Sequence, residues 1–103
     1  MVSLLIIDDE PIIRKLLSRM MELEGYEVFQ ADSCATGIKQ LKLHHPHVIL
    51  CDVILPDGNG VELIPEMKNQ SPDSEVIMLT AHGNIADGVQ AIKYGAFDYI
   101  TKG

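Results

Sequence analysis

Mostly apolar residues gather in five short runs along the chain, and segments with helical periodicity separate these runs. The runs are rich in β-branched residues and too short for helices, which is typical of strands buried inside a parallel sheet. We predict strands at residues 3–7, 26–31, 48–51, 75–79 and 96–101. The second run carries more charge than the others, so we expect it at an edge of the sheet.

Four helices are predicted between these strands. The first begins at Pro11, places apolar residues from 12 to 21 on one face, and ends near Gly25, which suits a left-handed cap. In the second, Ser33 is placed to cap a helix that runs on to residue 41. The apolar positions of the last two helices are Val61, Ile64 and Met67, and then Ile85, Val89 and Ile92.

Proline and glycine modify the last two helices. Pro65 kinks or tightens the third helix near its start, and Gly88 weakens the fourth by about 1 kcal/mol relative to alanine. Gly95 ends the fourth helix. Strands and helices that alternate in this way form parallel strands joined by right-handed crossovers, so the predicted fold class is a layered α/β sheet.

Composition narrows the class of protein. At 103 residues, of which 47% are apolar, the chain is one globular domain. Its net charge of −7 and its scattered Lys and Arg argue against nucleic-acid binding by this segment. The chain has no run of membrane-spanning length and no basic leader, so we expect a cytoplasmic protein that binds no membrane. Cys34 and Cys51 are unclustered, which favours reduced side chains over a disulfide or a metal pair.

Three histidines raise the question of a zinc site. His44, His45 and His47 lie close together, but none is paired at i, i+4 spacing and Pro46 interrupts them. A solvated helix end is the favoured interpretation of this cluster.

Asp52 directly follows the central apolar run at residues 48–51. The turn formers Pro56, Gly58 and Gly60 come next, so its carboxylate is expected where a core strand leaves the interior. Taken alone, an acid at this position is more often a cap for the next turn. It gains significance only if other polar groups converge on it.

Four of the five predicted strands end in polar residues. These residues are Asp8 and Asp9, Asp52, Thr80 and Lys102. The carboxyl ends of parallel strands meet at one edge of a sheet, where α/β proteins bind ligands. Three carboxylates held together would raise one another's pKa unless a cation neutralises them, and oxygen ligands suit Mg²⁺.

This set of groups is what phosphoryl transfer to an aspartate requires. Asp52 would be the nucleophile, Lys102 and Mg²⁺ would offset charge on the phosphoryl oxygens, and Thr80 would donate a hydrogen bond to one of them. The protein need not supply a general base.

The sequence resembles the receiver domains of bacterial two-component response regulators. The resemblance covers nearly the whole chain and is carried by Leu-Leu-Ile-Ile-Asp-Asp-Glu at 4–10, Cys-Asp-Val-Ile-Leu-Pro-Asp-Gly-Asn-Gly at 51–60, Leu-Thr-Ala at 79–81, and Lys-Tyr-Gly-Ala-Phe-Asp-Tyr-Ile-Thr-Lys at 93–102. It implies a flavodoxin-like (βα)5 doubly wound sheet with strand order 2-1-3-4-5, as in the chemotaxis member of the family. The amino-acid sequence of the last motif is most similar to that in receivers of the nitrogen-regulation transcription activators.

The resemblance also implies a function and its residues. A sensor histidine kinase would donate the phosphoryl group, and Mg²⁺ would be bound by Asp9, Asp52 and the backbone carbonyl of Ile54, with Asp8 acting through water. Thr80 and Tyr99 would form the conformational switch. The domain would be a regulatory phosphoacceptor rather than an enzyme and would control an effector domain, expected to be transcriptional and DNA-binding. A homodimer is compatible with this role.

The chain departs from the family pattern at one end. The family has proline after the lysine, where this chain has Gly103, and it continues into a fifth helix that residues 1–103 do not include. We therefore expect a receiver truncated before its last helix.

Two alternative functions stay open. A degenerate receiver would act as a phosphorylation-independent binding module, although all its key positions are present. A phosphohydrolase of the haloacid dehalogenase type would need a second aspartate at the position of Ile54.

Overall fold

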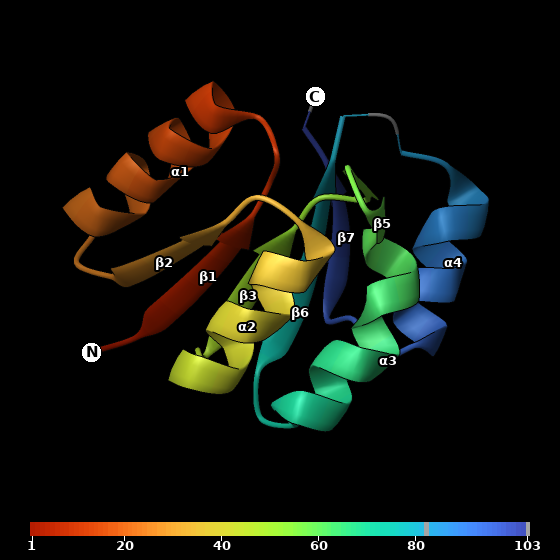
Figure 1. The fold of residues 1–103 in the computed structure, drawn as a ribbon. Coiled ribbons are helices and arrows are strands. Elements are labelled where there is room, and N and C mark those ends of the chain that lie inside the picture. Colours follow the sequence, from red (N-terminus) through yellow and green to blue (C-terminus); the bar gives the residue numbers. More distant parts are fainter. Residues whose placement is uncertain (82, 103) are drawn as a thin grey trace.

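A parallel five-stranded sheet forms the centre of the computed structural model, which describes residues 1–81 and 83–102. Its strand order is β2-β1-β3-β6-β7 (Figure 1), which is the predicted flavodoxin-like order with the sheet strands counted in sequence. The strands are β1 (Ser3–Ile7), β2 (Glu27–Ala31), β3 (Val48–Cys51), β6 (Glu75–Thr80) and β7 (Asp98–Thr101).

Four helices connect these strands. They are α1 (Pro11–Leu23), α2 (Cys34–His44), α3 (Gly60–Gln70) and α4 (Ile85–Lys93). Helices α2, α3 and α4 follow one another along one face of the sheet, whereas α1 lies apart from them against β1 and β2 (Figure 1). Within the described ranges, no helix combines the length and apolar character that a membrane span requires.

The helix ends agree with the predicted caps. Pro11 occupies the first turn of α1, and Gly25 beyond its end has a φ of +94°. The Ser33 side chain accepts a hydrogen bond from Thr36 N in a capping box, and Gly95 after α4 has a φ of +106°. Glycine adopts these left-handed conformations without the steric cost that a Cβ imposes.

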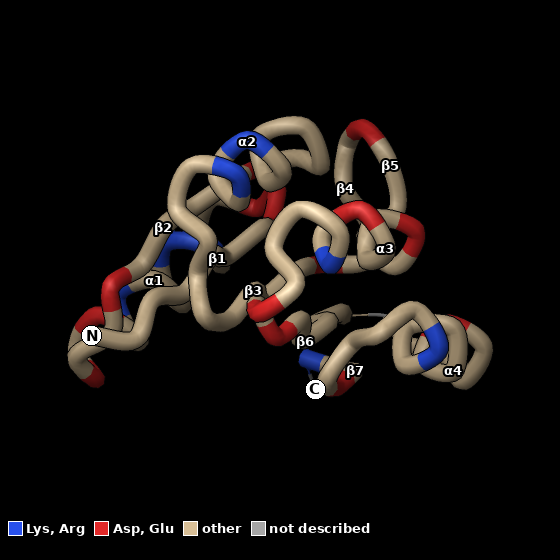
Figure 2. Tube along the Cα trace, turned by 90° about the horizontal axis from the view of Figure 1, so that it is seen from below, with Lys and Arg blue, Asp and Glu red and all other residues tan. Residues whose placement is uncertain are grey.

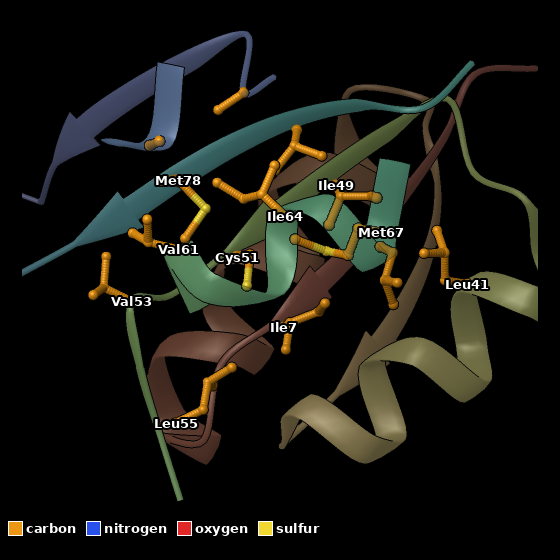
Figure 3. Close-up of a cluster of buried hydrophobic side chains, with 14 of the residues drawn as sticks. Ile7, Leu41, Ile49, Cys51, Val53, Leu55, Val61, Ile64, Met67 and Met78 are labelled. Atoms are coloured by element: carbon orange, nitrogen blue, oxygen red, sulfur yellow. The ribbon is translucent and has the colours of Figure 1, made fainter. Parts of the chain in front are cut away.

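The hydrophobic core lies between the sheet and helices α2 and α3 (Figure 3). The predicted stripe of α3 is buried there, together with Cys51 from β3. Members labelled in Figure 3 are Ile7, Leu41, Ile49, Cys51, Val53, Leu55, Val61, Ile64, Met67 and Met78. Strand β1 is buried along its whole length, while β2 is partly exposed at the sheet edge, where its charge placed it.

The apolar stripes of α1 and α4 are more exposed than their periodicity suggests. In α1, Ile12, Leu16 and Met20 are exposed, whereas Ser18 is the buried residue of the helix and its hydroxyl donates to the Arg14 carbonyl. Ile13 and Leu17, which belong to the same apolar stripe, are half-buried, and α1 contacts the sheet at β1 and β2.

Helix α4 shows the same difference more strongly. Its three predicted apolar positions are exposed, Ile85 by 87%, and the buried residue of the helix is Ala91. The periodicity therefore predicted the helix correctly, although the stripe faces away from the core.

Two smaller features differ from the prediction. Strand β7 begins at Asp98 rather than at residue 96, because Ala96 N donates to the Ala91 carbonyl and so still belongs to the turn after α4. A two-stranded hairpin, β4 (Ile54–Leu55) with β5 (Gly58–Asn59), follows β3 and was not predicted.

Charged residues are spread over the fold. Among the described residues, Lys and Arg lie on α1, α2, α3 and α4 and just after β7, with acidic residues between them (Figure 2).

Candidate functional site

The carboxyl ends of β1, β3, β6 and β7 bring the predicted site residues to one edge of the sheet. Asp8 follows β1, Asp52 follows β3, Thr80 ends β6, and Lys102 follows β7. The parallel register places Ile7 beside Cys51, Cys51 beside Met78 and Thr80 beside Thr101, so these strand ends meet at one edge of the sheet.

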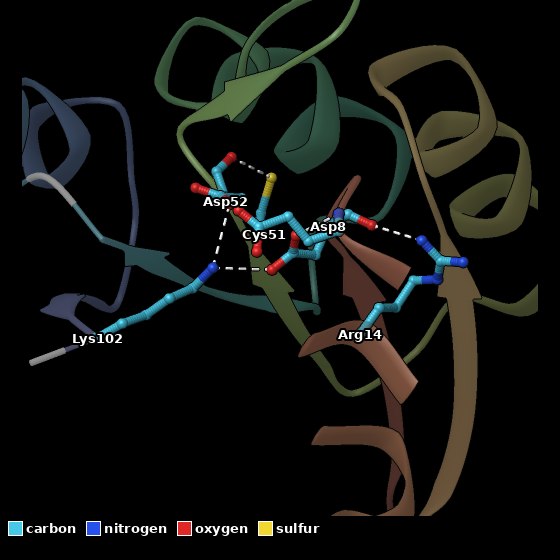
Figure 4. Close-up of polar contacts among 6 residues, drawn as sticks. Asp8, Arg14, Cys51, Asp52 and Lys102 are labelled. Carbon is cyan, nitrogen blue, oxygen red and sulfur yellow. Dashed lines mark hydrogen bonds and ion pairs between the residues drawn. The ribbon is translucent and has the colours of Figure 1, made fainter. Parts of the chain in front are cut away.

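The Lys102 ammonium joins two of the carboxylates. Its Nζ lies 2.8 Å from Oδ2 of Asp8 and 3.1 Å from Oδ2 of Asp52 (Figure 4). The Asp8 side chain is 3% exposed and that of Asp52 is 12% exposed. Burial lowers the pKa of Lys102, but the hydrogen bonds and charges of Asp8 and Asp52 outweigh burial and raise it above its ordinary value. Lys102 is therefore a cation at neutral pH.

Asp8 is held from both its main chain and its side chain. Its Oδ1 accepts a hydrogen bond from Glu10 N at 2.9 Å, and its carbonyl accepts one from Arg14 Nη1 at 2.9 Å (Figure 4). Asp8 N in turn donates to the carbonyl of Ala31. These contacts fix the carboxylate in the interior, where an unpaired charge would be costly.

Three carboxylates at this edge could hold a metal ion. Asp8, Asp9 and Asp52 each offer an oxygen, and these oxygens lie within 4.8 Å of one another. Asp9 is exposed, so a cation that bound here could keep water ligands. Mg²⁺ favours one or two carboxylates with several waters, so the donor set fits this ion.

A cavity of about 190 Å³ opens beside the carboxylates. Its lining residues are Asp9, Glu10, Asp52, Ile54, Thr80 and Ala81. It is thus bordered by acids on one side and by the end of β6 on the other, a space in which a small anion could be held between a metal and the sheet edge.

The loop after β3 closes tightly over Asp52. Asp52 N donates to the carbonyl of Ile7 at 2.9 Å, and Gly60 N donates to the carbonyl of Val53 at 2.6 Å. A Cβ at residue 60 would lie 2.0 Å from the Asp52 carbonyl oxygen, so this position requires glycine. The sequence marks Gly60 as a turn former but gives no sign of this close approach.

Thr80 and Tyr99 lie on the neighbouring strands β6 and β7, and Thr80 lines the cavity. Thr80 is buried, and its carbonyl accepts a hydrogen bond from Lys102 N at 2.6 Å. The Tyr99 hydroxyl accepts a hydrogen bond from Asn84 N at 3.4 Å, just before α4. The Tyr99 ring lies 3.4 Å from the position that a Cβ on Gly88 would take.

Two further residues at the site were missed from the sequence. Glu10 lines the cavity, and Arg14 holds the Asp8 carbonyl from the first turns of α1. Arg14 lies outside the apolar stripe of its helix, and helical spacing gives no sign of this contact. Gly103, where the family proline is replaced, lies outside the described residues.

The histidines lie elsewhere in the fold. His47 Nδ1 accepts a hydrogen bond from Ser3 N at 3.0 Å, at the opposite edge of the sheet. The His44 ring stacks on Phe29 with ring centroids 3.7 Å apart.

Comparison with known proteins gives a consistent family match. A family model described as the response regulator receiver domain matches residues 4–103. The chain is 41% identical over 100 residues to the acid tolerance regulatory protein ActR of Rhizobium meliloti (strain 1021), covering 97% of this chain and 52% of that protein. It is 34% identical over 99 residues to the regulatory protein AtoC of Escherichia coli (strain K12), covering 96% of this chain and 22% of that protein. The chain therefore spans about half of the first relative and about a fifth of the second.

Solved structures agree with this match. A response regulator protein from Burkholderia pseudomallei with a phosphorylated aspartic acid, a calcium ion and citrate superposes with a TM-score of 0.95 at 32% identity, covering 99% of this chain and 60% of that one. The beryllofluoride-activated NtrC4 receiver domain dimer gives a TM-score of 0.92 at 41% identity, covering 100% and 85%.

Proposed function

The chain belongs to the family of response regulator receiver domains, and from this premise we propose that it accepts a phosphoryl group on Asp52 from a sensor histidine kinase. One observation carries the choice of Asp52. Among the described residues, it is the carboxylate that both lines the cavity and contacts the Lys102 ammonium. Asp8 contacts Lys102 without lining the cavity, whereas Asp9 lines the cavity but does not share the ion pairs that Lys102 forms with Asp8 and Asp52.

Asp52, Lys102 and Thr80 would each have a separate role in the phosphoryl transfer. An oxygen of Asp52 attacks phosphorus as the bond to the donor nitrogen breaks, and Lys102 holds an oxygen of the transferred group. Thr80, at the far side of the cavity, donates a hydrogen bond to another of these oxygens. Positive groups that are already in place need no reorganisation when charge develops.

Mg²⁺ is the proposed metal. Asp9, Asp52 and the backbone carbonyl of Ile54 would hold it, with Asp8 acting through water, and three of these four residues line the cavity. When bound, Mg²⁺ offsets the negative charge that the carboxylates and the phosphoryl oxygens bring together. The phosphorylated relative was crystallised with a calcium ion, which supports a divalent-cation site in this family.

The domain is regulatory in kind, and we propose a switch that involves Thr80 and Tyr99. Thr80 would move toward the phosphoryl oxygen, Tyr99 would move into the space it leaves, and α4 would follow. The relatives are named as regulatory proteins and are longer than this chain, which supports control of a transcriptional effector domain. The NtrC4 receiver dimer supports a homodimer as the active form.

The test is incubation with acetyl phosphate, with and without Mg²⁺, followed by intact-mass measurement. We expect one phosphoryl group per chain in the presence of Mg²⁺, stable to acid and labile to base, and none in Asp52→Asn. Asp73→Asn is the matched control, because Asp73 is an exposed acid at the opposite edge of the sheet. Uptake that persisted in Asp52→Asn would assign the phosphoacceptor to another residue.

A further inference from the structure

The β4–β5 hairpin contacts helix α2 through one acidic side chain. Asp57 lies at the hairpin turn, and its Oδ1 accepts a hydrogen bond from Cys34 N at 2.7 Å while its Oδ2 accepts one from Ala35 N at 3.0 Å. These are the first two N–H groups of α2, which have no acceptor within the helix. The two hydrogen bonds lower the pKa of Asp57, so it is ionised at neutral pH.

Asp57 completes a cap that α2 only partly provides for itself. The Ser33 side chain accepts a hydrogen bond from Thr36 N and leaves Cys34 N and Ala35 N for a partner from another part of the chain. A negative charge at this position also interacts favourably with the helix dipole. The contact therefore ties the hairpin to a helix more than twenty residues earlier in the chain.

The hairpin is held at a second point by α3. The Asn59 side chain accepts hydrogen bonds from Val61 N at 2.8 Å and Glu62 N at 3.3 Å, which caps that helix. Between the two helices, Ile54 pairs with Asn59, and the Leu55 side chain is buried in the core.

The hairpin begins two residues after Asp52, so its placement matters for the site. Ile54 is both the first residue of β4 and part of the cavity lining. Its side chain is largely exposed, so burial of that side chain does not fix its backbone. Asp57 does not itself line the cavity.

We infer that Asp57 is a positioning residue for the metal side of the site. By anchoring the hairpin to α2, it holds the Ile54 carbonyl in place beside Asp52 and Asp9. The inference rests on the proposed function, because the group that this carbonyl would bind is Mg²⁺. Outer contacts that orient metal ligands typically change metal affinity by roughly 10- to 100-fold when removed.

The experiment is a Mg²⁺ titration followed by ¹⁵N-resolved NMR, together with amide hydrogen exchange, on the wild type, Asp57→Ala and Asp57→Asn. For Asp57→Ala we expect an apparent Kd for Mg²⁺ raised by about tenfold and faster exchange of amides 53–60. For Asp57→Asn we expect a smaller rise, because the amide keeps one acceptor oxygen. At saturating Mg²⁺, both variants should be phosphorylated by acetyl phosphate at the wild-type rate.

Asp32→Ala controls for charge. Asp32 is an exposed acid just before α2 that accepts a hydrogen bond from Thr36 Oγ1, within its own loop and helix, whereas the hydrogen bonds from the hairpin to α2 are those of Asp57. An equal loss of affinity in Asp32→Ala and Asp57→Ala would overturn the inference in favour of a general charge effect, as would an unchanged Kd in Asp57→Ala. A wild type that took up no Mg²⁺ would instead overturn the proposed function.

Discussion

Gly60 packs directly over the backbone of Asp52, leaving no room for a side chain between them. A Cβ at residue 60 would lie 2.0 Å from the Asp52 carbonyl oxygen and 3.0 Å from Met78 Cε. The first of these is a backbone atom, so a rotamer change cannot relieve the clash. The close approach allows Gly60 N to bond to the Val53 carbonyl and so turns the chain sharply after the proposed phosphoacceptor.

We expect Gly60→Ala to displace this loop. The overpacked site should lower the free energy of unfolding by about 1–3 kcal/mol and reduce both Mg²⁺ affinity and phosphoryl uptake. Urea unfolding and intact mass would measure the two effects. Gly88→Ala is the matched control, because a Cβ there makes ordinary contact with the Tyr99 ring and alanine favours the helix interior by up to about 1 kcal/mol. Gly60→Ala as stable and active as the wild type would contradict the steric argument.

Lys102 should contribute stability in a pH-dependent way. Its pKa is raised in the folded state, so its contribution is present below its ordinary pKa of 10.5 and is lost as the pH rises through the folded value. Lys102→Met removes the charge and keeps the length. We expect this variant to be less stable than the wild type at pH 7 and the difference to shrink above pH 10.5.

Urea unfolding of the wild type and of Lys102→Met between pH 7 and 11 measures the difference in their free energies of unfolding. The contributions of the other titrating groups largely cancel in this difference. Phosphorylation of Lys102→Met should also be slow, because the phosphoryl oxygens lose a cation. A stability difference that stayed constant through pH 11 would argue against the ion pairs as its source.

The thiol of Cys34 should react slowly. Burial, followed by the hydrogen bond and charge of Asp57, raises its pKa from 9.0 to about 11. The folded protein favours the neutral thiol, so the contribution of Cys34 to the free energy of unfolding is fully present below pH 9. This contribution is lost as the pH rises toward 11. At pH 8, native Cys34 should be alkylated by iodoacetamide roughly a hundredfold more slowly than in urea, because the thiolate is the nucleophile.

Peptide mapping by mass spectrometry would assign the alkylated residue, and burial raises the pKa of Cys51 as well. Asp57→Asn should speed the reaction at Cys34, since it removes the negative charge of Asp57, which is one of the causes that raise the pKa of the thiol. Equal rates in the native and unfolded chains would be inconsistent with this environment.

The strands could be predicted because burial on both faces imposes a continuous apolar run. The run at residues 3–7 and the run at 48–51 match β1 and β3, and the edge position of β2 followed from its charge. The convergence of polar residues followed in turn, because parallel strands share one carboxyl edge.

The remaining features depend on contacts that local sequence patterns do not encode. Periodicity shows that Ile12 and Ile85 lie on apolar helix faces, but it does not show which neighbour covers those faces. The hairpin strands are two residues long each, too short for an alternating pattern. The hydrogen bonds of Asp57 to α2 join residues far apart in sequence, so no spacing rule predicts them.

Signal transmission should depend on the Thr80 side chain. Thr80→Ala should still be phosphorylated, since Asp52 and Lys102 are intact, but phosphorylation should no longer change hydrogen exchange in residues 84–99. Thr80→Ser keeps the hydroxyl and should restore the response. The same phosphorylation-dependent changes in Thr80→Ala as in the wild type would show that another group links the site to α4.

The surface between α1 and β7 is apolar and open. A cavity of about 290 Å³ there is lined by Ile13, Leu16, Leu17, Leu79 and Lys102, and Ile100 nearby is 43% exposed. Burying aliphatic side chains of this size is worth about 1.5–3 kcal/mol each, against a total stability of about 5–15 kcal/mol. We propose that an amphipathic helix covers this surface, as helices cover the opposite face of the sheet.

Residues 1–103 should be compared with a version that also carries the natural segment after residue 103, where the gene encodes one. We expect the added helix to raise the thermal midpoint and to suppress self-association, measured by calorimetry and sedimentation. Leu16→Glu tests whether packing on this surface, rather than chain length, causes these effects. In the longer chain it should cancel most of the rise in the thermal midpoint. In residues 1–103 it should reduce self-association and so raise solubility, because the exposed apolar surface drives that association. Equal midpoints and monomeric behaviour for both lengths would mean that this surface needs no covering helix.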